Sequence, residues 1–72
     1  MYWLNIDRPT GVARLHRDSC DHAQQREETH LKGVGSNKSD GGWHDCNTRH
    51  DAQVIANADG MELSDCEVCR PA

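Results

Sequence analysis

The chain has 72 residues and a formal net charge of −4, with two Trp, one Tyr, no Phe and an apolar share of 35%. A chain of this length forms a single domain, residues 1–72, and its core alone would supply only about 3–5 kcal/mol of net stability. Because large apolar side chains are nearly absent, we expect a metal ion or disulfides to close the fold. No segment approaches the roughly 20 apolar residues of a membrane span, and no secretory signal is visible. We therefore expect a cytoplasmic protein with no membrane partner.

The charge is unevenly distributed along the chain. Residues 1–38 carry six basic and five acidic side chains, whereas residues 39–72 carry two basic and seven acidic ones. Non-specific affinity for nucleic acid comes from basic side chains that release counterions. Any nucleic-acid contact would therefore use the N-terminal half, and the acidic half is expected to be a solvated surface.

The first elements form a β-hairpin. Residues Tyr2 to Ile6 alternate between two faces, with Tyr2, Leu4 and Ile6 on one face and Trp3 and Asn5 on the other, which indicates a strand. Residues 7–11 contain Pro and Gly in a turn-like arrangement, and residues 12–16 return as a second strand.

The middle of the chain is less regular. Residues 21–29 are mostly polar and predict an irregular or short helical surface segment, and residues 31–42 are glycine-rich and predict a long loop. Trp43 to Cys46 predicts a short strand that places Trp43 in the core.

One helix is expected near the C-terminus. Thr48 can cap it, with Asp51 in the third following position of an imperfect capping box, and Gly60 can terminate it. A narrow apolar stripe recurs at helical spacing at Ala52, Ile55 and Ala56. Residues 61–64 can add a short strand before the last motif. The predicted fold class is α+β: an N-terminal hairpin, a third short strand, one C-terminal helix and a zinc turn.

Cysteine and histidine spacing points to a metal site. Cys66 and Cys69 are separated by two residues, so their thiols can converge on one ion, and tetrahedral zinc then needs two further donors. His16 and Cys20, with three residues between them, are the best candidates. We predict one structural Zn²⁺ bound by His16, Cys20, Cys66 and Cys69.

Two alternatives to His16 stay open. His22 lies two residues after Cys20, and Cys46 could supply a fourth thiolate. A free Cys directly before a helix more commonly packs as a small apolar residue, which favours His16.

Three segments together resemble the metal-binding domain of the Ada DNA-repair proteins. They are residues 16–20 (HRDSC), residues 43–52 (WHDCNTRHDA) and residues 66–71 (CEVCRP). The resemblance implies a small α+β domain in which a Cys-x3-Cys pair and a Cys-x2-Cys pair hold one zinc. In that family the first thiolate accepts a methyl group from a DNA phosphotriester. His16 occupies that position here, so methyl transfer would require Cys20 instead. A second resemblance, to small uncharacterised zinc-binding proteins of prokaryotes, is carried by residues 2–5 (YWLN), 15–20 (LHRDSC), 32–35 (KGVG) and 41–43 (GGW).

The main functional hypothesis is a non-catalytic zinc module whose partner is a protein or a nucleic acid. A closed site with four ligands lacks the open position of catalytic zinc, so we do not expect an enzyme. Trp3 would be exposed opposite the Leu4 face. The contact face would comprise Arg8, Arg14, Arg17, Arg26, Lys32 and Lys38, although ordinary surface charge is the favoured interpretation of these residues. The alternatives are a thiol-based alkyl acceptor at Cys20 and a redox or zinc-buffering role for Cys66 and Cys69.

Overall fold

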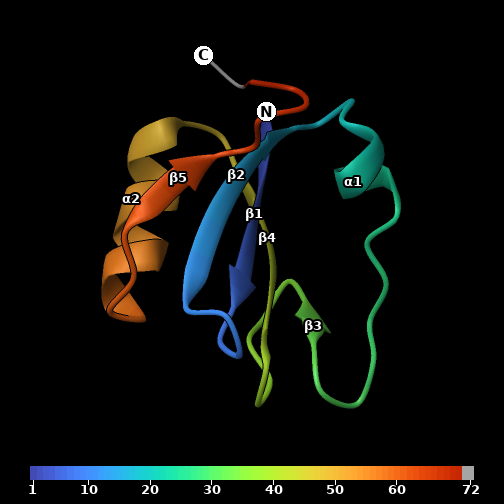
Figure 1. Ribbon diagram of the computed structural model, residues 1–72, viewed down its shortest axis with the longest axis vertical. Coiled ribbons are helices and arrows are strands. Elements are labelled where there is room, and N and C mark those ends of the chain that lie inside the picture. Colours follow the sequence, from blue (N-terminus) through green and yellow to red (C-terminus); the bar gives the residue numbers. More distant parts are fainter. Residues whose placement is uncertain (71–72) are drawn as a thin grey trace.

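The computed structural model describes residues 1–70 as one five-stranded sheet with two helices. In chain order the elements are β1 (Tyr2–Asp7), β2 (Val12–Arg17), α1 (Asp21–Gln24), β3 (Gly33–Val34), β4 (Gly41–Cys46), α2 (Arg49–Ala58) and β5 (Leu63–Asp65). Figure 1 shows α1 and α2 on opposite sides of the central β1–β2 pair. The predicted α+β class is confirmed. Within residues 1–70 no helix has the length and apolar character needed to cross a membrane.

The sheet is mixed, with its strands in the order β3-β4-β1-β2-β5. β1 lies at its centre and pairs antiparallel with both β2 and β4. The predicted hairpin is confirmed, and its register places Leu4 opposite Leu15. The two short outer strands are parallel to their neighbours, β5 to β2 and β3 to β4. The β2–β5 pairing joins segments that are far apart in the sequence, so local patterning did not reveal it.

The larger core lies between the sheet and α2. Successive side chains of a strand point to opposite faces, and on this face Leu4, Ile6 and Leu15 are fully buried. The cluster is completed by small residues of β2, β4 and α2, namely Ala13, Cys46, Ala52 and Ala56. Burying one Leu or Ile side chain contributes about 1.5–3 kcal/mol, so three of them make a small core.

Both ends of α2 match the sequence signals. The Thr48 hydroxyl accepts a hydrogen bond from the backbone N–H of Asp51 at 3.1 Å. Gly60 has φ of +71°, and its N–H donates to the carbonyl of Asn57 at 3.0 Å. A residue without a Cβ adopts this left-handed conformation without strain. The predicted cap and terminator are confirmed.

The glycine-rich segment contains more order than expected. Within residues 31–42, predicted as a loop, Gly33 and Val34 pair with Gly42 and Trp43 as parallel strands. This arrangement requires glycine at both positions, because a Cβ on either Gly33 or Gly42 would collide with the carbonyl of Ser36. The glycines therefore allow a tight turn that returns the chain to the sheet edge.

The second face of the sheet carries a smaller core beside α1. Trp43 is 9% exposed there, as predicted, and it clusters with the buried residues Cys20, Ala23 and Cys66. The prediction that Trp3 is exposed is wrong, since its side chain is half-buried. Its indole N–H donates to Asp18 at 3.0 Å, and the Arg26 guanidinium lies 3.9 Å above its ring. Alternation placed Trp3 opposite Leu4 correctly but did not show that α1 covers this face.

Candidate metal centre

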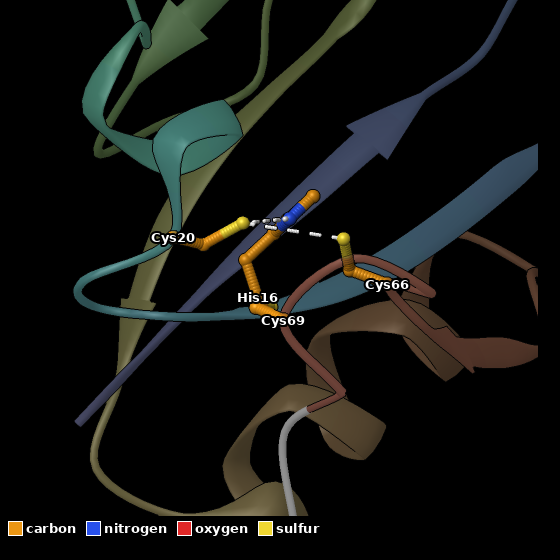
Figure 2. A group of neighbouring side chains, drawn as sticks. All are labelled: His16, Cys20, Cys66 and Cys69. Carbon is orange, nitrogen blue, oxygen red and sulfur yellow. Dashed lines mark hydrogen bonds between the residues drawn. The ribbon is translucent and has the colours of Figure 1, made fainter.

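Four potential metal ligands from three separate segments lie together on the α1 side of the sheet. His16 is near the end of β2, Cys20 immediately precedes α1, and Cys66 and Cys69 lie in the turn after β5. One ligand atom from each lies within 4.8 Å of all the others. Figure 2 shows the side chains of His16, Cys20 and Cys66 pointing toward one another. The structure thus brings together the four residues predicted from spacing, while their coordination of an ion stays a prediction.

The spacing between the donor atoms suits a tetrahedral ion. Zinc bonds of about 2.3 Å to sulfur and 2.0–2.1 Å to nitrogen place tetrahedral S–S pairs about 3.8 Å apart and N–S pairs about 3.5 Å apart. The observed separations are 4.0 Å between the sulfurs of Cys20 and Cys66 and 3.6 Å between Cys20 Sγ and His16 Nδ1. A disulfide would require about 2.05 Å, and all four cysteines are free. The four residues fit a single metal site.

Backbone pairing holds the two halves of the cluster in register. The parallel β2–β5 ladder places Leu15 opposite Asp65. The N–H of Cys66 then donates to the carbonyl of Leu15 at 2.9 Å. On the other side, the N–H of Cys20 closes a turn by donating to the carbonyl of Arg17 at 3.0 Å. Cys20 and Cys66 are therefore each held to β2 by a main-chain hydrogen bond.

Arg17 adds contacts that spacing did not predict. Its backbone N–H donates to the sulfur of Cys69 at 3.2 Å. Its guanidinium donates to the carbonyls of Cys69 and Arg70 at 2.8 and 3.1 Å. Arg17 thus anchors the C-terminal turn. In the sequence, the only signal for this role was the position of Arg17 directly after a predicted ligand.

His16 is prepared for metal binding by its environment. It is 4% exposed, and its imidazole lies against Trp43 with ring centroids 5.4 Å apart. The pKa of His16 is lowered from 6.5 to about 4, mainly by burial and to a smaller extent by the positive charges of His22 and Arg14. A histidine must be neutral to coordinate an ion, and this one is neutral at physiological pH.

The thiols at the C-terminal turn differ in acidity. Burial tends to raise the pKa of Cys66, but hydrogen bonds from the backbone of Cys69 and Val68 outweigh burial and lower it. Burial raises the pKa of Cys69 to about 11, against the hydrogen bond from the Arg17 backbone. Cys66 is therefore the more readily ionised of the pair, and a bound cation would favour the thiolate of both.

Neither alternative ligand joins this group. His22 is exposed, and its ring centroid lies 6.0 Å from that of His16. Cys46 belongs to the core against α2, where burial raises its pKa to about 11. Its packing as a small apolar residue, the favoured interpretation of the sequence, is confirmed.

The six basic residues proposed as a contact face have diverse surroundings. Arg8 pairs with Asp59 at 2.8 Å, Lys38 with Glu28 at 3.6 Å and Lys32 with Asp7 at 3.9 Å. Arg17 and Arg26 bind backbone carbonyls. Arg14 is exposed and lines each of three surface hollows along the second face. Three of the six residues thus form ion pairs within the protein, and two more donate hydrogen bonds to its backbone.

Fold and site together define the protein as a small α+β domain with a His/Cys₃ cluster between the first hairpin and the C-terminal turn. No protein-family model, curated protein or solved structure matches the chain. The resemblance to the Ada metal-binding domain accordingly stays a prediction.

Proposed function

We propose that the protein is a non-catalytic zinc-binding module, in which one structural Zn²⁺ is bound by His16, Cys20, Cys66 and Cys69. The observation that carries the proposal is the mutual approach of the four donor atoms within 4.8 Å. Three sulfurs and one imidazole are typical of closed structural zinc sites. Thiolates also favour zinc over the hard cations magnesium and calcium, which prefer oxygen ligands.

The burial of the cluster argues for a structural role. Cys20 and Cys66 are only 4% and 3% exposed. A sulfur that accepts an alkyl group from DNA needs an approach path for a bulky phosphotriester, so burial disfavours the alkyl-acceptor alternative at Cys20. Bound in a closed set of four, the zinc would also have no free position for a substrate.

We infer that the partner of this module is a protein rather than a nucleic acid. Arg8, Lys32 and Lys38 form ion pairs, and the formal charge of the chain is −4. Both features reduce attraction to phosphates. We expect no binding of the zinc-loaded protein to a single-stranded oligonucleotide in fluorescence anisotropy. Binding that weakens steeply with added salt would instead support a nucleic-acid partner.

Native mass spectrometry of the reduced protein tests the metal directly. We expect one zinc per chain in the wild type, and loss of that zinc in Cys20→Ser and Cys66→Ser. Cys46→Ala is the matched control, because Cys46 is equally buried but lies in the other core. A metal-free wild type, or a Cys46→Ala protein that loses the ion, would contradict the proposal.

A further inference from the structure

Two buried polar atoms on the α1 side of the sheet have no hydrogen-bond partner within residues 1–70: His16 Nε2 and Asn5 Oδ1. Leaving such a group unpaired costs about 1–3 kcal/mol, so unpaired buried atoms are uncommon and need an explanation. These two are chemically complementary when the imidazole binds a metal through Nδ1, because Nε2 then carries the proton.

The fold places the two residues next to each other. In the β1–β2 register Asn5 lies opposite Arg14, and His16 follows two residues later on the same face. Residues in this diagonal relation on antiparallel strands are about 7–8 Å apart at their Cα atoms, within reach of longer side chains. Both line the same hollow of about 300 Å³, whose other walls are Arg14, His22, Gln25 and Trp43.

The surroundings offer His16 few other acceptors. Nδ1 faces the sulfur of Cys20 at 3.6 Å, which leaves Nε2 on the other side of the ring. Among the described residues, no carboxylate lines the hollow. Its remaining side-chain amide is that of Gln25, which is exposed at the end of α1. Asn5 belongs to the central strand of the sheet, and its oxygen is buried.

We propose that Asn5 is a positioning residue for the metal site: its carboxamide oxygen accepts a hydrogen bond from His16 Nε2–H when zinc occupies the site. Metal-bound histidines almost always donate their second N–H to a carboxylate, a backbone carbonyl or water, which fixes the tautomer and the ring orientation. The carboxamide oxygen of Asn5 takes the place of that acceptor here. Asn5 thus satisfies both unpaired atoms with one bond and directs Nδ1 toward the sulfurs. This inference rests on the proposed zinc site.

The test combines zinc affinity, measured by competition with a chelator, with ¹⁵N NMR of the zinc-loaded protein. In the wild type we expect the Nε2–H of His16 to exchange slowly with water. Asn5→Leu should raise the zinc dissociation constant about 10–100-fold and remove that protection. Asn5→Asp keeps an acceptor oxygen and should restore both. Asn47→Leu, the same change at an exposed position, is the control and should leave both at the wild-type value.

The outcomes separate the two proposals. A wild type that takes up no zinc overturns the proposed function. A wild type that binds zinc while its His16 Nε2–H exchanges freely overturns the role of Asn5, whether or not Asn5→Leu folds. Equal affinity and protection in Asn5→Leu and the wild type would overturn it too.

Discussion

At the residue scale, the environment of each histidine decides what it can do. His16 and His44 both have a pKa below 6.5 because burial disfavours the imidazolium. They lie on opposite faces of the sheet, since His44 pairs with Leu4 in the β1–β4 register and His16 pairs with Trp3 in the hairpin. Of these two histidines, only His16 faces the thiols of Cys20, Cys66 and Cys69. The Nε2 atom of His44 instead lies 2.7 Å from the amide oxygen of Asn37.

His44 should make stability depend on pH. Its pKa in the folded protein is lowered by burial, although Asp45 and Asp59 oppose the shift. As the pH falls through 6.5 the unfolded chain therefore takes up a proton that the folded chain does not, and stability decreases. We expect the loss of unfolding free energy between pH 7.5 and 5.5, measured in urea, to be smaller in His44→Gln than in the wild type. His30→Gln, at an exposed position, is the control; an equal loss in all three proteins would refute the prediction.

At the element scale, α2 covers the larger core with a narrow surface. Its fully buried side chains are those of Ala52 and Ala56, which allow close approach to the sheet but bury little area. Helices of this length are marginal in water without tertiary packing. The stability of the N-terminal end of α2, which follows β4, therefore depends on its cap.

Removing the N-cap should destabilise the domain measurably. Thr48→Ala deletes the hydroxyl that accepts from the N–H of Asp51, at an expected cost of about 0.5–2 kcal/mol. Thr48→Ser retains an acceptor and should stay close to the wild type. Chemical denaturation of the zinc-loaded proteins provides the comparison. A Thr48→Ala protein as stable as Thr48→Ser would show that this hydrogen bond contributes little.

Local signals predicted the elements better than they predicted the pairing between them. Strand alternation identified the hairpin, while Thr48 and Gly60 marked both ends of α2. The same alternation could not show that β5 joins β2 in parallel, because that pairing depends on contacts between residues 13–15 and 63–65. It also missed the cover over Trp3, which comes from Asp18 and Arg26.

The candidate site was predictable for a different reason. Ligand spacing reflects the geometry of an ion, so pairs separated by two or three residues are informative without knowledge of the fold. The contacts around the ligands were not predictable in this way. Arg17 and Asn5 are ordinary polar residues by sequence, and only the sheet register places them beside Cys69 and His16.

At the scale of the whole molecule, the cluster joins the end of β2 to the segment before α1 and to the turn after β5. The fully buried large side chains are those of Leu4, Ile6 and Leu15, all in the hairpin. β5 contributes only three residues, Leu63–Asp65, to the sheet edge. Structural zinc in small peptides contributes about 10–16 kcal/mol of apparent binding free energy, compared with about 3–5 kcal/mol from a core of this size. We infer that the ion, rather than the core, determines whether the chain is folded.

The most direct test of this account is a ¹H–¹⁵N NMR spectrum of the reduced protein before and after one equivalent of zinc is added to chelator-stripped material. The account predicts collapsed amide dispersion without metal, and a fully dispersed spectrum that saturates at one zinc per chain. A dispersed spectrum in the stripped protein, with an unfolding midpoint that zinc does not change, would contradict it.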